Sequence, residues 1–105
     1  MPRPEPPYYA VIFTSRRTEG DNGYAQRATE MSKLAAEQDG YRGEESARDE
    51  SGFGITVSYW RDEEAIAGWR KNLKHTESRR RGRAEWYEEF DVRVARVERS
   101  YGFTR

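Results

Sequence analysis

The order of hydrophobic patterns along the chain constrains its fold more than any other feature of the sequence. Alternation with a period of two residues is typical of strands, and apolar spacings of three to four residues are typical of helices. These patterns predict strands at 8–16, 41–49, 53–60 and 89–101, and helices at 24–38 and from 63 towards Gly82. The order is βαββαβ, and two right-handed crossovers around a central hairpin make it a ferredoxin-like α+β sandwich.

Short polar side chains and a glycine are expected to bound the two helices. Asp21 or Asn22 is the predicted N-cap of the first helix, and Gly40 is the predicted stop at its end. Asp62 is predicted to cap the second helix, and the acidic residues that follow it suit the helix dipole. The strand at 41–49 is the most polar of the four, so we expect it at or near an edge of the sheet.

Composition narrows the class of protein. The 105 residues suit one domain, predicted at 8–105, and all four prolines lie in a predicted disordered arm at 1–7. Lysine plus arginine total 19 and aspartate plus glutamate total 19, which argues against a strongly basic nucleic-acid-binding protein. Cysteine is absent from the sequence, so a reducing cytoplasm is the expected compartment. No apolar run approaches the roughly 20 residues of a membrane helix, so no membrane association is expected.

The predicted sheet has more apolar surface than two helices can cover. Val11, Ile12 and Phe13 place apolar side chains on both faces of the first strand. Both helices are expected on one face, which leaves the other face open in a single chain. We therefore expect a second copy of the chain to pack against the open face, giving a homodimer.

Residues 53–98 carry a series of motifs that resembles a known superfamily. In order along the chain they are "ITVSYW", "RDEEAIAGWR", His75, "GR", "WY" and "RVARVE". This series resembles the antibiotic biosynthesis monooxygenase (ABM) superfamily of dimeric α+β barrels. The resemblance implies a homodimer whose sheets form a barrel, with a cavity between sheet and helices in each subunit. Some members oxidise polyketide quinols or anthrones with oxygen and without metal or flavin. The resemblance thus implies a cofactor-independent monooxygenase with a small aromatic substrate.

Three residues are candidates for the site. Trp69 and Trp60 are predicted to bind the substrate as walls of the cavity. His75, the only histidine, is the predicted catalytic base that takes a proton from a phenolic substrate. Each residue also has a structural interpretation: core packing for Trp69, a plug at the strand end for Trp60, and a surface or capping role for His75. The sequence contains no metal-ligand cluster, so no metal is expected.

Other functions fit parts of the sequence. Heme-degrading members of the superfamily use an Asn on the first strand, a Trp on the second helix and a His further along that helix. Here Trp69 matches, but Thr14 or Ser15 and Arg79 occupy the other two positions. The stretch "SGFGITVS", residues 51–58, resembles the third strand of an RNA-recognition motif but has only one of its aromatics. A dimeric ligand-binding or stress-related module without catalysis is the alternative from another class.

Overall fold

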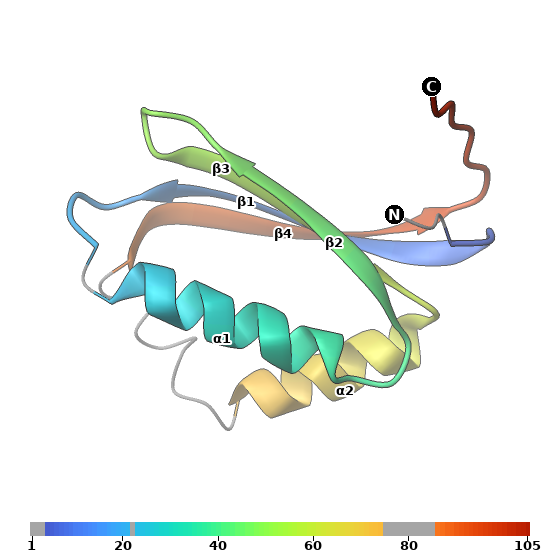
Figure 1. The fold of residues 1–105 in the computed structure, drawn as a ribbon. Helices are drawn as coiled ribbons and strands as arrows, with labels where there is room; N and C mark the ends of the chain where they lie inside the picture. The colour runs from blue at the N-terminus through green and yellow to red at the C-terminus, as the bar shows by residue number, and fades with distance from the viewer. Residues whose placement is uncertain (1–3, 22, 75–85) are drawn as a thin grey trace.

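The fold follows the predicted order of elements. The computed structural model describes residues 4–21, 23–74 and 86–105. Its elements are β1 (Tyr8–Arg17), α1 (Tyr24–Ala36), β2 (Tyr41–Arg48), β3 (Phe53–Trp60), α2 (Glu63–Lys74) and β4 (Tyr87–Val97). The strands form one antiparallel sheet in the order β2-β3-β1-β4 (Figure 1). This confirms the βαββαβ, ferredoxin-like α+β fold, and it confirms the polar strand β2 as an edge.

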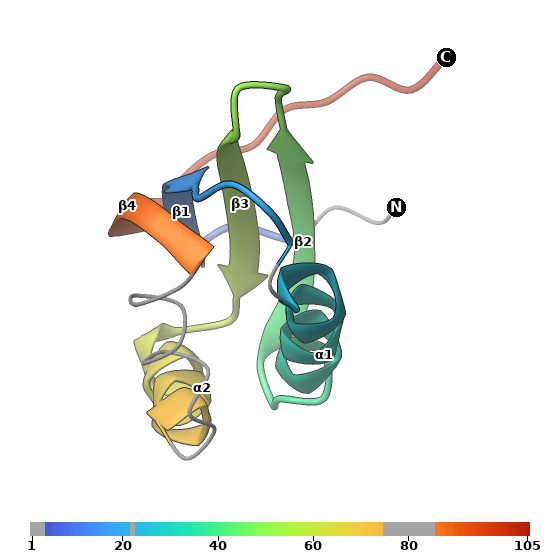
Figure 2. The same ribbon diagram turned by 90° about the vertical axis from the view of Figure 1, so that its left-hand side faces the viewer.

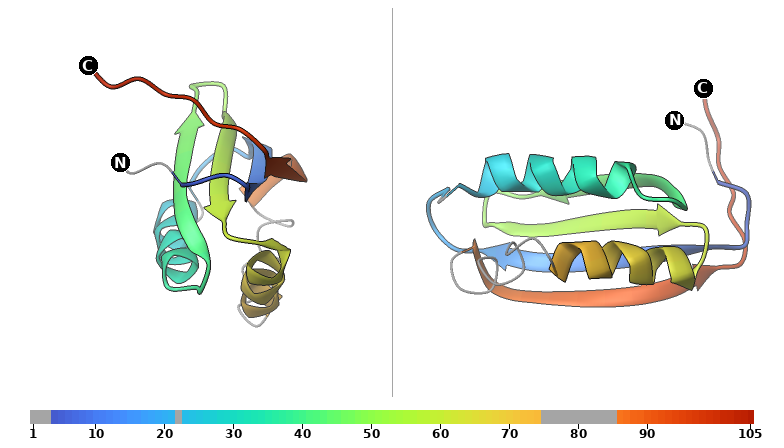
Figure 3. Two further views of the ribbon diagram at one scale, coloured as in Figure 1. Left: turned by 90° about the vertical axis from the view of Figure 1, so that its right-hand side faces the viewer. Right: turned by 90° about the horizontal axis from the view of Figure 1, so that it is seen from below.

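Both helices lie on the same face of the sheet, here called the helix face (Figure 2). No described helix covers the opposite face, here called the open face (Figure 3). The structure therefore has two layers, with the helices on one side as predicted. No helix in the described part of the chain is long and apolar enough to cross a membrane.

The register of β1 decides which side chains meet the helices. Val11 belongs to the buried core cluster with Ala35 of α1 and with Ala65 and Ile66 of α2, so it faces the helices. Alternate residues of a strand point to opposite faces, and directly paired residues share a face. The odd-numbered residues of β1 therefore lie on the helix face, and the even-numbered ones lie on the open face.

The Asp62 cap is confirmed, whereas Asp21 is not the N-cap of the first helix. The Asp62 carboxylate accepts a hydrogen bond from the Ala65 backbone N–H at 2.8 Å, so it caps α2. At α1 the N-cap position itself is Gly23, which offers no side chain. The Asp21 carboxylate nevertheless accepts the Ala25 N–H at 3.1 and 3.2 Å, which satisfies one free donor of the first turn.

Several predicted boundaries are wrong by a few residues. The first helix ends at Ala36, so Gly40 is not its stop; it lies in the turn before β2. The last strand runs over 87–97 instead of 89–101. The early end has a physical cause: β4 pairs only with β1, and Val97 is opposite Tyr8, the first residue of β1. The predicted continuation of the second helix to Gly82 lies outside the described residues.

Gly40 is required by close packing between the β2 turn and α2. Its φ is 87°, in the left-handed region, and its carbonyl accepts the Arg61 N–H at 2.8 Å. A Cβ on this residue would lie 2.5 Å from the Ala65 Cβ. Gly23 has a similar φ of 83°, but a Cβ there would meet nothing within 4 Å.

We predict that Gly40→Ala destabilises the fold more than Gly23→Ala. Both variants bear the cost of a positive φ, whereas only Gly40→Ala also forces α2 away from the turn, at about 1–3 kcal/mol extra. Urea unfolding followed by circular dichroism measures the difference. Equal loss of stability in the two variants would show that the contact with Ala65 relaxes at no cost.

Candidate functional site

Tyr41, Trp60 and Trp69 form a tryptophan cluster on the helix face. The rings of Trp60 and Trp69 stack with centroids 5.1 Å apart, and Tyr41 meets Trp60 edge-on at 5.6 Å. Trp60 is 0 % exposed, and its indole N–H donates to the buried Ser58 hydroxyl at 2.9 Å. The structure thus brings Trp60 and Trp69 together from β3 and α2. Trp60 is fully enclosed and hydrogen-bonded within the fold. These contacts do not test its role as a substrate wall, which stays a prediction.

Trp69 differs from Trp60 in its hydrogen bonding. The ring is half-buried, and its Nε1 atom is buried without a hydrogen-bond partner among the residues that the structure describes. A buried N–H without an acceptor costs about 1–3 kcal/mol, and such groups are rare in folded proteins. An unpaired donor of this kind is suited to an oxygen atom of a ligand. His75, the predicted base, lies outside the described residues.

The helix face includes an accessible apolar strip on β4. Val94 pairs with Val11 and Val92 pairs with Phe13, which places both valines on the helix face. Even so, Val92 is 55 % exposed and Val94 is 48 % exposed. The helices therefore leave apolar sheet surface within reach of a ligand on this side.

A second group of side chains lies at the other end of the helix face. Arg17, Tyr24, Arg48 and Tyr87, here called the tyrosine–arginine cluster, come from β1, α1, β2 and β4. The Arg17 guanidinium carbon lies 3.7 Å from the centre of the Tyr24 ring. The Arg48 guanidinium donates to the Tyr24 hydroxyl at 3.3 Å and to the buried Ser15 hydroxyl at 2.9 Å.

The surroundings of the Tyr87 phenol perturb its pKa. Its ring meets Tyr24 edge-on at 5.7 Å and Phe13 edge-on at 5.4 Å. Burial raises the pKa of Tyr87 well above its usual value, and a hydrogen bond with the Tyr24 hydroxyl raises it further. The positive charges of Arg48 and Arg17 act in the opposite direction.

Sequence reasoning missed the tyrosine–arginine cluster. Its four members are spread from position 17 to position 87 and belong to no motif.

Gly54 and Trp60 mark the two ends of the helix face on β3, and six residues of strand span roughly 20 Å. The two clusters are therefore distinct places on one surface. Within the described ranges, no group of three or more His, Cys, Asp or Glu side chains could hold a metal ion.

The family of the chain is shown by comparison with known proteins. A family model described as antibiotic biosynthesis monooxygenase (ABM) matches residues 7–81, well over half of the chain. The chain belongs to the antibiotic biosynthesis monooxygenase family. This ABM-family protein is also 52 % identical over 96 residues to the uncharacterized protein YqjZ of Bacillus subtilis (strain 168), with 91 % of this chain and 84 % of YqjZ covered.

Solved structures share the fold of this ABM-family protein at low sequence identity. SnoaB, a cofactor-independent oxygenase from Streptomyces nogalater, matches with a TM-score of 0.72 and 10 % identity, covering 90 % of this chain and 96 % of SnoaB. Rv0793 from Mycobacterium tuberculosis matches with a TM-score of 0.73 and 18 % identity, covering 90 % of this chain and 99 % of Rv0793. At these identities the likeness establishes the fold.

We predict that Tyr24→Phe lowers the pKa of Tyr87 towards the ordinary value of about 10. The substitution removes the hydroxyl that hydrogen-bonds with Tyr87 and leaves the ring in place. In the wild type the raised folded pKa means that stabilisation is present below the unfolded pKa and is lost as pH rises through the folded value.

Ultraviolet titration of phenolate, read as the difference between proteins with and without Tyr87→Phe, measures this pKa. Tyr101→Phe is the control, because Tyr101 is 86 % exposed and lies on the C-terminal tail. An unchanged Tyr87 midpoint in the Tyr24→Phe protein would contradict the assigned hydrogen bond.

Proposed function

We propose that this protein is a homodimeric, cofactor-independent monooxygenase that acts on a small electron-rich aromatic of the quinol or anthrone type. The observation that carries the proposal is the buried indole N–H of Trp69, unpartnered among the described residues, in a chain of the ABM family. The accessible valines of β4 supply apolar surface on the same face of the sheet. The likeness in fold to SnoaB, a cofactor-independent oxygenase, supports the reaction class.

The proposed chemistry needs no external reductant. Deprotonation of the substrate makes an electron-rich anion that can transfer an electron to oxygen. In an anthrone, the methylene carbon then loses two hydrogens and gains one oxygen atom as a carbonyl. The second oxygen atom leaves as water, so the substrate supplies all the electrons that oxygen takes up. The protein has to orient the substrate, exclude water and stabilise the anion.

The roles follow from these requirements. His75 is proposed, on its sequence alone, as the base that removes the proton. The Trp69 N–H is proposed to donate to the substrate oxygen, where negative charge develops. Trp60 stacks on Trp69 at 5.1 Å and is proposed to complete the wall by holding that ring in place.

We predict that Trp69→Phe lowers kcat/KM for a turned-over anthrone by about 100-fold, because it removes the N–H donor and keeps an aromatic ring. Oxygen uptake with 1,8-dihydroxyanthrone and related quinols is the measurement. Trp60→Phe is the matched control: its N–H is already bonded to Ser58, so the variant should lose stability and keep far more of its kcat/KM. His75→Ala should remove the acidic limb of the pH–rate profile.

Two outcomes would contradict the proposal in different ways. Equal turnover by folded Trp69→Phe and wild-type protein would remove Trp69 from the site and leave the activity standing. A lack of substrate-dependent oxygen uptake with every anthrone and quinol tested would count against the activity itself.

The homodimer in this proposal rests on exposed surface. The single chain exposes 7675 Å², whereas a compact monomer of this size exposes about 6,100 Å². The excess is roughly twice the area of about 800 Å² that each partner buries in a standard protein interface. Phe53 and Ile55 lie on the open face and are 37 % and 41 % exposed. The C-terminal tail, which carries the exposed Tyr101 and Phe103, leaves the sheet on the side away from the helices (Figure 1).

We predict that Ile55→Glu converts the homodimer to a monomer, because the charge would be buried between two open faces without a partner. Val92→Glu is the matched control, since Val92 is an exposed apolar strand residue on the helix face. Size-exclusion chromatography with light scattering measures both masses. A dimeric Ile55→Glu protein would exclude the open face as the subunit contact.

A further inference from the structure

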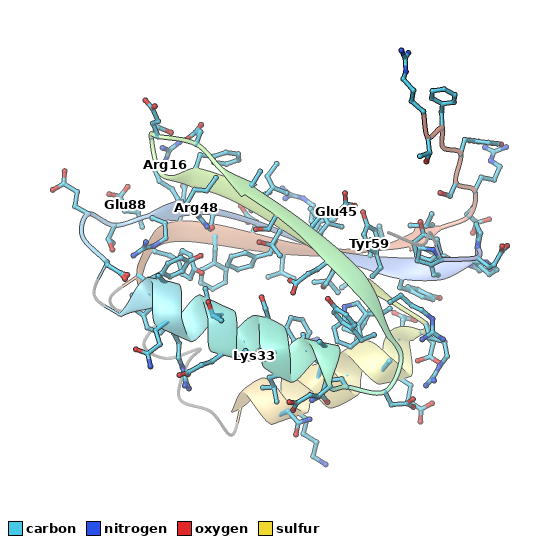
Figure 4. The ribbon with its side chains drawn as sticks, viewed as in Figure 1. Arg16, Lys33, Glu45, Arg48, Tyr59 and Glu88 are labelled. Carbon is cyan, nitrogen blue, oxygen red and sulfur yellow. The ribbon has the colours of Figure 1, made fainter. Side chains whose placement is uncertain are left out.

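We propose that the tyrosine–arginine cluster is a binding site for an aromatic carboxylate. The site lies at the end of the sheet where α1 begins, and Figure 4 labels Arg48 there. It is separate from the tryptophan cluster. The proposal therefore goes beyond the monooxygenase function and does not depend on it.

Positive charge gathers in this cluster, and no carboxylate of the described residues forms an ion pair with it. Arg17 and Arg48 lie 3.7 and 5.7 Å from the centre of the same Tyr24 ring. Neither arginine forms a salt bridge with any acidic residue in the described parts of the chain, although the whole sequence has equal numbers of acidic and basic residues. Two like charges near one ring repel each other, and a bound anion would relieve that repulsion.

The arginines are held in place by neutral acceptors. Arg17 donates to the carbonyls of Trp86, Gly20 and Asp21 at 3.0, 3.2 and 3.3 Å. Arg48 donates to the Gly52 carbonyl at 2.6 Å and to the Ser15 hydroxyl at 2.9 Å. Carbonyl and hydroxyl oxygens position the guanidinium groups and leave their charge in place. Such preorganisation is what an anion site requires.

Donors remain after these bonds are made. Neither Arg17 Nη1 nor Arg48 Nε has an acceptor among the described residues. The Tyr24 hydroxyl, which accepts from Arg48, lies beside both guanidinium groups. Two guanidinium groups and a phenol match the two oxygens of a carboxylate, because guanidinium donors fit carboxylates in pairs.

Aromatic rings beside these donors select the rest of the ligand. Phe13 meets Tyr87 edge-on at 5.4 Å and stacks on Phe90 at 5.6 Å. Tyr87 also meets Tyr24 edge-on at 5.7 Å, so it links these phenylalanines to the arginines, and both Phe13 and Tyr87 are half-buried. Rings that already pack in edge-to-face pairs accept another ring in the same way. Arg48 is exposed, so a ligand can reach the charge from solvent. An aromatic acid meets these conditions better than inorganic phosphate.

A purely structural role for the two arginines is the competing explanation, and binding of 2-naphthoate separates the two. Its fluorescence and calorimetric titration with the wild-type protein should give saturable binding, and the neutral 2-naphthamide should bind at least about tenfold more weakly. Arg17→Gln and Arg48→Gln should each weaken 2-naphthoate binding at least about tenfold. Inorganic phosphate should compete poorly.

Arg16→Gln is the matched control. Arg16 is the neighbour of Arg17 in sequence but lies on the open face, where its guanidinium is 5.8 Å from the Phe53 ring. This variant should bind 2-naphthoate as the wild type does. Arg17→Lys and Arg48→Lys keep the charge, and melting curves identify any variant whose loss of binding reflects unfolding.

Three results would overturn the proposal. These are no saturable 2-naphthoate binding, equal affinity for the acid and the amide, and unchanged affinity in both folded glutamine variants. Inorganic phosphate that displaces 2-naphthoate as well as an unlabelled aromatic acid does would also overturn it, since it would reveal a general basic patch. None of these results bears on oxygen uptake, so this proposal and the monooxygenase proposal fail separately.

Discussion

The pairing of β1 with β3 on one side and β4 on the other determines the rest of this structure. Because β1 is central, its alternation assigns every neighbouring strand residue to the helix face or the open face. A slip of one residue would move Val11 away from the helices and carry Arg17 to the other side of the sheet. The packing of Val11 under Ala35, Ala65 and Ile66 holds the register in place. Every feature of the helix face depends on it.

The tryptophan cluster and the tyrosine–arginine cluster both contain packed aromatic rings, but their polar groups differ in hydrogen bonding. Trp60 is sealed, and its only polar side-chain atom is bonded within the fold, so its ring contributes packing. Trp69 stacks on it but leaves a donor unpaired among the described residues. The tyrosine–arginine cluster has fixed charges, and its acceptors among the described residues are neutral groups. Chemistry is therefore available where the packing leaves charge or donors unsatisfied, rather than where rings are most tightly enclosed.

Sequence patterns predicted the elements of the fold because periodicity and capping are local. A few neighbouring residues are enough to predict the strand at 53–60 and the Asp62 cap, and both are confirmed. The end of β4 was predicted too late, because it is determined by where β1 begins and not by the residues after Val97. Gly40 was predicted as a helix stop for a similar reason: its true constraint is the approach of Ala65, a residue 25 positions later.

The candidate site was less predictable because its chemistry depends on contacts between distant segments. Trp69 was singled out from the sequence, yet only its surroundings show that its N–H has no described acceptor. The neutral overall charge gave no sign of Arg17 and Arg48, two neighbouring arginines that have no ion pair among the described residues. Arg16 and Arg17 illustrate the difficulty, since two adjacent identical residues lie on opposite faces: one beside the proposed subunit contact and one beside the proposed carboxylate. Substitutions at two adjacent positions of β1 therefore probe opposite faces of the sheet. Comparing the two variants of such a pair separates effects on the subunit contact from effects on the ligand sites.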